Sequence, residues 1–252
     1  MTQWLDDYQR GSFWSTVSTA NPGYHLLLDP SDVPAVTLHV PPAQGGTFFN
    51  LNTNRPVGAV SGDWFRRQLQ ALLNSLQVSP KTLAVFVPYN TFVTEQNPND
   101  CIRNPDSCAT AAGYHSAAIG STNPNAINTF AYAAYLDAGT LSPYNWGTLP
   151  LSHEILEWAA DPFAHSSRIQ GQAAFLQNRA PAWSSPYYFN FCATYLEVAD
   201  PLFGIGFLAV PPDQHALADG AFLSWFARQS PSTGIFGLYD IAGLFSTYSM
   251  AC

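Results

Sequence analysis

One segment constrains the fold of this chain more than any other: Leu149–Ala160, which reads LPLSHEILEWAA and is followed by Asp161-Pro162. The spacing of its apolar residues predicts a helix, and the Asp-Pro pair predicts where that helix ends. Residues four apart share a helix face, so His153, Glu157 and Asp161 are expected one above another. We therefore expect a helix with one chemically active face, laid against a mixed sheet.

The remaining pattern predicts an α+β fold in one domain, residues 1–252, with a motif-bearing core at about 36–203 and a loop-rich C-terminal part at 204–252. Ser61 is typical of a helix N-cap, and the helix after it should turn one apolar face inward. That face is expected to hold Trp64, Phe65, Leu69, Leu72, Leu73 and Leu76. We also predict a loop-like start at 1–35, strands at 36–40, 82–87, 114–119 and 129–136, and a second helical stretch at 222–228.

Composition excludes several classes of protein. Hydrophobic residues make up 47% of the chain and charged residues only 10%, which is the opposite of a disordered segment. No apolar run approaches the roughly 18 residues that a membrane span requires. The net charge is −8 and Lys81 is the only lysine, so we expect no basic patch for nucleic acid.

The low charge and the abundance of Asn, Ser, Thr, Pro and Tyr favour an exported protein, in which disulfides persist. Four cysteines allow three pairings, of which we expect Cys101–Cys108, closing a local loop, and Cys192–Cys252. Four buried thiols are the alternative. No cationic-then-apolar leader follows Met1, so either processing precedes this start or export is the wrong expectation.

Glutamate is scarce, and most of it lies near the predicted helix: of four glutamates, only Glu95 is distant from the motif. In the zinc-peptidase motif H-E-x-x-H, two histidines bind the ion and the intervening Glu acts as general base. Here Glu157 stands at the second ligand position, and a carboxylate is also a competent zinc ligand. A third ligand must then come from elsewhere in the chain. Alternatively, His153 and Glu157 form only a hydrogen-bonded pair on a half-buried helix.

Three segments together resemble a family of exported proteins: GYHSA at 113–117, SHEILEWAADP at 152–162 and LEVAD at 196–200. Bacterial and fungal members carry G-Y-H-S, then S-H-E-L-x-E-A-x-T-D-P, then E-I-G-D, and the plant exordium (phosphate-induced) proteins carry a related version. Members are described as zinc-dependent peptidases of the zincin type, mostly from the motif, and the plant branch as extracellular growth-related proteins. The resemblance covers about residues 82–201, but this chain reads Glu-Val-Ala-Asp-Pro where the family commonly has E-I-G-D followed by Cys.

The resemblance implies a zincin-like fold and a set of metal ligands. His153, Glu157 and Glu197 would bind one zinc ion, Glu197 by analogy with the third ligand of thermolysin-type zincins. One neutral nitrogen and two carboxylates would cancel the +2 charge of the ion, whereas a two-histidine site leaves one positive charge. The ion should therefore be a weaker Lewis acid than in the standard site, and the protein a poorer peptidase or none.

The resemblance also implies roles for the residues around the ligands. Glu154 would be the general base, and His115 would steady the oxyanion as an electrophile or hydrogen-bond donor. Asp200 would orient His153, and Asp161 also matches the motif. Simpler interpretations remain: Asp161 before Pro162 suits a helix end, and His115 suits a core histidine. His165 is a reserve ligand.

The leading functional hypothesis is a secreted, metal-dependent hydrolase acting on peptide or protein substrates. The alternative from another class is a non-catalytic extracellular binding protein that keeps the zincin scaffold. A third possibility is a metal-free glycan hydrolase that uses Glu154 or Glu157 with Glu197 as acid and base.

Overall fold

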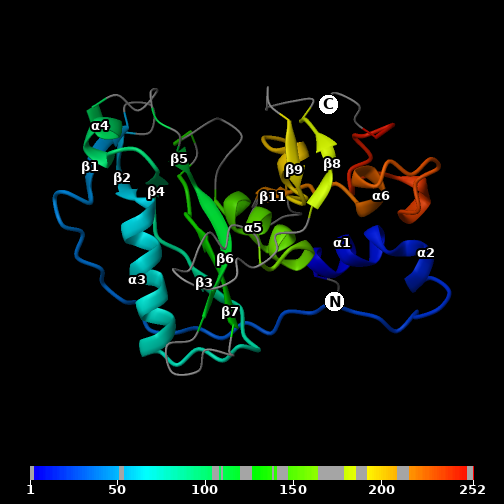
Figure 1. Ribbon diagram of the computed structural model, residues 1–252, viewed down its shortest axis with the longest axis horizontal. Helices are drawn as coiled ribbons and strands as arrows, with labels where there is room; N and C mark the ends of the chain where they lie inside the picture. Colours follow the sequence, from blue (N-terminus) through cyan, green and yellow to red (C-terminus); the bar gives the residue numbers. More distant parts are fainter. Residues whose placement is uncertain are drawn as a thin grey trace.

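The computed structural model describes residues 3–50, 54–103, 108, 110–119, 127–137, 139–140, 147–163, 179–185, 192–208, 216–248 and 252. These residues form short helices and mixed sheets, which confirms the α+β class. Figure 1 shows helix α3 (Gly62–Ser75) on one side and the long strands in the middle. Helices α1 (Trp4–Ser12), α2 (Trp14–Val17) and α6 (Leu223–Phe226) lie on the other side, with α5 (Leu149–Ala160) between the two halves.

Two sheets make up the middle of the chain. One has the order β1-β2-β4-β5, with β1 Gly45–Asn50, β2 Arg55–Ser61, β4 Thr91–Thr94 and β5 Thr110–Ala111. The other has the order β3-β7-β6, with β3 Ala84–Phe86, β7 Ile127–Ala133 and β6 Gly113–Ile119. In the second sheet β6 runs antiparallel to β7, and β3 runs parallel to it. In the first sheet β2 runs parallel to β4, and the other two pairs are antiparallel. Both sheets are therefore mixed, whereas the sequence predicted one mixed sheet.

The helix predicted after Ser61 is α3, Gly62–Ser75. The backbone N–H of Trp64 donates to Ser61 Oγ over 3.4 Å, so Ser61 is the N-cap. Phe65 and Leu69 are buried in a cluster that includes Val60 of β2 and Phe92 of β4, and α3 contacts both strands. This apolar face is the reason that α3 covers the first sheet.

The predicted helix over the motif is α5, with the expected bounds Leu149–Ala160. Trp158 Nε1 donates to Thr129 Oγ1 of β7 over 2.9 Å. On another side of the helix, the N–H of Ala218 in β11, Ala216–Ala218, donates to Ser152 Oγ over 2.8 Å. The helix is thus fixed between β7 and a strand that lies much later in the sequence.

A second hydrophobic core joins the first helix of the chain to later elements. It contains side chains of α1, Trp4–Ser12, and of α6, Leu223–Phe226, together with Leu156 of α5. The Tyr8 hydroxyl of α1 donates to the carbonyl of Ala221 over 2.9 Å. In Figure 1, α1 accordingly lies beside α6 and the end of α5.

Two expectations for the start of the chain are wrong. Residues 1–35 are not only loop, because α1 and α2, Trp14–Val17, lie within them. Tertiary contacts explain α1: Asp6 is buried and accepts hydrogen bonds from His25 Nδ1 and the backbone of Leu26, each over 2.8 Å. Residues 36–40 form no strand, because no described strand pairs with them.

Two of the other predicted elements are shorter than expected, whereas the strands predicted at 114–119 and 129–136 form as β6 and β7. Of the strand predicted at 82–87 only β3 forms, at the edge of its sheet. Val85 within it and Val87 just after it are exposed by 39% and 50% instead of buried. The stretch 222–228 contains the single turn α6. Among the residues described from 204 onward, loops connect β10, Gly206–Leu208, β11, α6 and a 3₁₀ turn at Ile235–Gly237.

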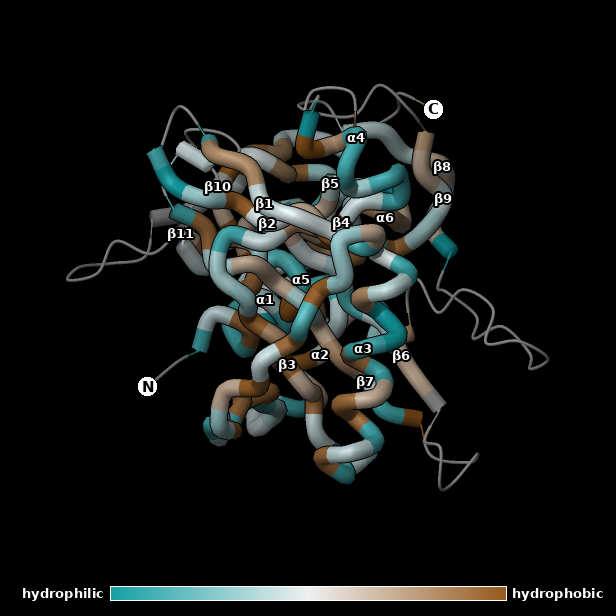
Figure 2. The backbone as a smooth tube through the Cα atoms, turned by 90° about the vertical axis from the view of Figure 1, so that its left-hand side faces the viewer, coloured by the Kyte–Doolittle hydropathy of each residue, from teal (hydrophilic) through white to brown (hydrophobic). Residues whose placement is uncertain are grey.

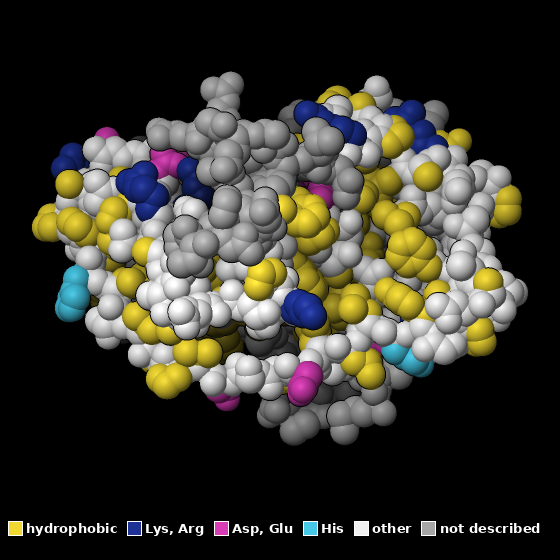
Figure 3. Space-filling model, turned by 60° about the horizontal axis from the view of Figure 1, so that its bottom comes forward, with side chains coloured by type: hydrophobic (Ala, Val, Ile, Leu, Met, Phe, Trp, Pro, Cys, Tyr) yellow, Lys and Arg dark blue, Asp and Glu magenta, His cyan; other side chains and the backbone are white. Residues whose placement is uncertain are grey.

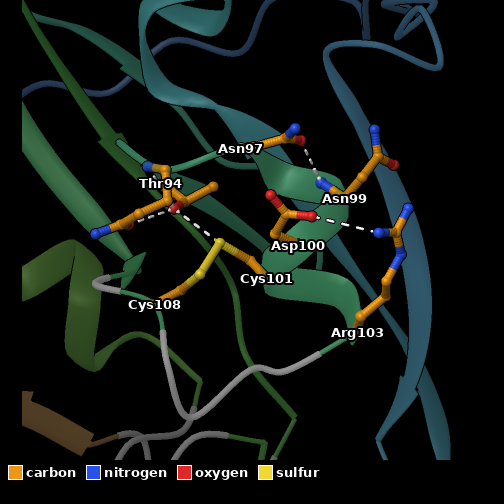
Figure 4. The surroundings of a disulfide bond; sticks show 8 residues. Thr94, Asn97, Asn99, Asp100, Cys101, Arg103 and Cys108 are labelled. Atoms are coloured by element: carbon orange, nitrogen blue, oxygen red, sulfur yellow. Dashed lines mark hydrogen bonds and ion pairs between the residues drawn. A yellow bond between two sulfur atoms is a disulfide. The ribbon is translucent and has the colours of Figure 1, made fainter.

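Both predicted disulfides are present, Cys101–Cys108 and Cys192–Cys252. Figure 4 shows the first of them beside Thr94 at the end of β4, joined to α4, Pro98–Arg103. Thr94 Oγ1 lies 3.2 Å from Cys101 Sγ. The second joins Cys252 to the residue before β9, Ala193–Tyr195, which pairs with β8, Arg179–Trp183. These cross-links favour an oxidising environment outside the cytosol.

The surface reflects the composition. Hydrophobic and hydrophilic stretches alternate along the backbone (Figure 2), and one face of the molecule shows scattered hydrophobic side chains with few charged ones (Figure 3). Among the described residues, no helix is both long and apolar enough to cross a membrane.

Candidate metal centre

Three parts of the fold bring acidic and imidazole side chains together. Helix α5 supplies His153, Glu154 and Glu157, and strand β6 supplies His115. The segment after β9 supplies Glu197, and the 3₁₀ turn Asp200–Leu202 that follows it supplies Asp200. Strand β6 and helix α5 pack directly against each other, which places the middle of β6 over the active face of the helix.

His115 lies in the most enclosed part of this cluster, with 1% of its surface exposed. Its Nε2 is 2.9 Å from the backbone carbonyl of Asp161. Its Nδ1 is 3.2 Å from Glu154 Oε2 and 3.8 Å from Glu157 Oε2. Glu197 Oε2 lies 4.0 Å from the same nitrogen. One ring nitrogen of His115 thus faces three carboxylates.

His153 forms a second group with Glu157 and Asp200. Its Nε2 is 3.2 Å from Glu157 Oε1 and 3.4 Å from Asp200 Oδ1. The ring of Phe203 meets the imidazole edge-on, with 5.7 Å between the ring centres. The side chains of His153 and Asp200 are exposed by 12% and 21%, so solvent reaches this side of the cluster.

Glu157 belongs to both groups. Its Oε1 also accepts a hydrogen bond of 3.3 Å from the backbone N–H of Ala199. Glu157 is exposed by only 3%, and Glu197 by 2%. Among the described residues, the ion pairs of Glu157 and Glu154 are all with histidines, and none is with Lys or Arg.

The carboxylates change the protonation of both histidines. Burial would lower the pKa of His115, but the hydrogen bond to Glu154 and the charges of Glu197, Glu154 and Glu157 raise it to about 9. Burial would likewise lower the pKa of His153, yet Glu157 and Asp200 raise it well above its ordinary value. The cluster therefore attracts positive charge strongly, whether that charge is a proton or a cation.

The donor atoms suit a metal ion. In the group His115, Glu154 and Glu157, and again in the group His153, Glu157 and Asp200, one ligand atom from each residue lies within 4.8 Å of the others. Each group offers one imidazole nitrogen and two carboxylate oxygens, which are ligands that divalent first-row metals accept. These residues could therefore hold a metal ion.

The structure brings together the residues that the sequence singled out, but it groups them differently. Asp200 completes the group around His153, while Glu197 faces His115, so a ligand role for Glu197 stays a prediction. His115 faces carboxylates, and its contact with Asp161 is to the backbone carbonyl. Asp161 itself has left the helical conformation, with φ −143° and ψ 77°, as the helix-end interpretation expects.

Some features were missed or lie elsewhere. No role was predicted from the sequence for Gly113, which packs against Glu154. Asp200 Oδ1 lies 3.4 Å from His153 Nε2, and the orienting role of Asp200 stays a prediction. His165 lies outside the described residues.

Comparison of this chain with models of protein families, with curated proteins and with solved structures finds no match.

Proposed function

We propose that this protein is a secreted, metal-dependent hydrolase of the zincin type, with its metal held by His153, Glu157 and Asp200. The observation that carries the proposal is the His153 group itself. Two ligands lie four residues apart on one helix, a third comes from a later segment, and Glu154 follows the first ligand. This differs from the H-E-x-x-H arrangement mainly in having a carboxylate as second helical ligand.

The proposed ion is zinc. Zinc accepts mixed nitrogen and oxygen ligands, and a catalytic zinc site has three protein ligands and an open position. The partial exposure of His153 and Asp200 supports an open position on their side of the cluster. When bound, zinc polarises a substrate carbonyl and makes water more acidic.

Glu154 is the proposed general base. It follows His153 on α5, and its Oε2 is held by His115 Nδ1 at 3.2 Å. The other oxygen, Oε1, lies on the side of Gly113. A carboxylate fixed in this way can take a proton from water and pass it to the leaving group. His115 then acts as a positioning residue for the base.

The charge of the site limits the expected rate. Two carboxylates offset the charge of a divalent ion, so the ion activates water less than in a site with two histidines. We therefore expect slow hydrolysis of peptide bonds. The alternative, a non-catalytic binding protein, shares the same metal site and differs only in turnover.

Elemental analysis of the purified protein tests the proposal. We expect at least one zinc ion per chain in the wild type, one ion fewer in His153→Ala, and the wild-type content in His39→Ala, which changes an exposed histidine. Protein without metal would overturn the proposal. Bound metal without hydrolysis of a broad peptide library would favour the binding protein.

A further inference from the structure

We propose that His115, Glu154 and Glu157 form a second divalent-cation site, which shares Glu157 with the first and inhibits the enzyme when it is filled. This inference rests on the proposed function, because it concerns the regulation of the same centre. The three side chains are exposed by only 1%, 5% and 3% respectively. The second site is therefore closed, in contrast to the partly open group around His153.

The hydrogen bonds of His115 fix the direction of its free lone pair. A backbone carbonyl can only accept, so the contact of 2.9 Å with Asp161 requires the hydrogen on Nε2. In neutral His115 the lone pair is then on Nδ1, which faces three carboxylates. A lone pair opposite anionic oxygens is repulsive unless a cation or a proton lies between them. Metal-binding histidines show the same pattern, with the second ring N–H donated to a carbonyl or carboxylate.

The two oxygens of Glu157 face different histidines. Oε1 lies 3.2 Å from His153 Nε2, and Oε2 lies 3.8 Å from His115 Nδ1. A carboxylate placed in this way can give one oxygen to each of two ions. Paired metal sites in hydrolytic enzymes hold their ions about 3.5–4 Å apart. Glu157 is thus in position to bridge two cations.

Glu154 connects the second site to catalysis. In the proposed function its carboxylate accepts a proton, whereas in the second site the same carboxylate binds a cation. It cannot serve both purposes at once, because a ligated carboxylate is a poor base. Filling the second site should therefore stop turnover while the first ion remains bound.

Zinc binding to the metal-stripped protein at pH 8 provides the test, by equilibrium dialysis with elemental analysis. We expect two ions in the wild type and in the control His39→Gln, and one ion each in His115→Gln and His153→Gln. Hydrolysis should rise with the first equivalent and fall at least tenfold with the second, and His115→Gln should not show the fall. Two ions without that fall would overturn the inhibitory role.

The remaining outcomes separate this inference from the proposed function. A single ion in the wild type, lost in His153→Gln, would overturn the second site and leave the proposed function standing. A single ion lost only in His115→Gln, or no ion at all, would overturn both. If His115→Gln does not fold, X-ray absorption of the wild type with two zinc equivalents replaces it. Zinc–zinc scattering at about 3.5–4 Å would support the shared site, and its absence would overturn it.

Discussion

Glu154 lies so close to Gly113 that a Cβ atom on this glycine would stand 2.6 Å from Glu154 Oε1. The glycine of the G-Y-H segment therefore makes room for the proposed base. We predict that Gly113→Ala displaces Glu154, destabilises the fold by about 1–3 kcal/mol and lowers hydrolysis at least tenfold. Denaturant unfolding and steady-state kinetics measure the two effects.

Gly62→Ala is the matched control for that substitution. A Cβ at Gly62 would meet its nearest atom, the carbonyl oxygen of Thr94, at an ordinary 3.5 Å. We expect the free energy of unfolding of Gly62→Ala to stay within about 0.5 kcal/mol of the wild-type value. If Gly113→Ala behaves like this control, Glu154 is not confined by β6.

Glu154→Gln separates metal binding from catalysis. The amide keeps the shape of the side chain but cannot accept the proton, so we predict normal zinc content at the His153 group and loss of turnover. Zinc analysis and peptide hydrolysis are the two measurements. If Glu154→Gln keeps a turnover within twofold of the wild type, Glu154 is not the general base.

Glu157→His restores the H-E-x-x-H motif. Imidazole nitrogen suits zinc better than carboxylate oxygen does, so we predict tighter zinc binding. The greater positive charge left on the ion predicts faster hydrolysis. It should also remove the carboxylate that the two proposed sites share, and the protein should then bind one ion. A competition titration against a chelator checks the affinity. Unchanged or weaker binding would show that Glu157 is not a ligand of the first ion.

The pairing of Asp6 with His25 predicts a loss of stability in acid. Burial alone would raise the pKa of Asp6, but the hydrogen bonds from His25 and Leu26 and the charges of His25 and Arg10 lower it below its usual 3.8. A carboxyl group with a lowered pKa stabilises the fold above its unfolded pKa, and this contribution is lost as the pH falls through the folded value. Asp6→Asn should therefore cost about 1–3 kcal/mol at pH 7 and progressively less below about pH 4.

Denaturant unfolding across this pH range gives the measurement, with Asp32→Asn, an exposed aspartate, as control. A cost of Asp6→Asn that does not change between pH 7 and pH 3 would contradict the prediction.

The buried carboxyl group of Asp219 should give the opposite pH dependence of stability. Burial, the hydrogen bond with Asp240 and the charge of Asp240 raise the pKa of Asp219 to about 9. The folded protein then holds a proton that the unfolded chain releases above about pH 4. Stability should fall as pH rises from about 5 to 8, by up to about 1.4 kcal/mol per pH unit from this group. Asp219→Asn should flatten that slope, because an amide does not titrate, and an unaltered slope would refute the assignment.

Local patterns in the sequence were enough to predict helix α3 and the site helix α5. The N-cap at Ser61 and the bounds of α5 follow from capping and from the spacing of apolar residues. Helix α1 could not be predicted in this way, because its buried Asp6 is satisfied by residues about twenty positions later. The strand expected at 36–40 failed because apolar composition alone does not supply a pairing partner.

In the candidate site, too, local patterns predict some features, whereas others depend on contacts between distant segments. Spacing along one helix was sufficient to place His153 and Glu157 together. The distribution of Glu197 and Asp200 between two histidines depends on how the segment after β9 passes over α5, and no local pattern encodes that path. The orientation of His115 likewise depends on the carbonyl of Asp161, which the helix end presents.

The hydrogen bond from Tyr8 to Ala221 spans 213 positions of sequence. During synthesis, α1 leaves the ribosome long before the residues that cover it exist. The apolar face of α1 and the side of α5 that packs in the same core must therefore remain exposed until translation is almost complete. Contacts of such long range slow folding and expose chains to aggregation in the interval. Production of this protein should accordingly depend on chaperones that hold early segments, and slower elongation alone should not improve its yield.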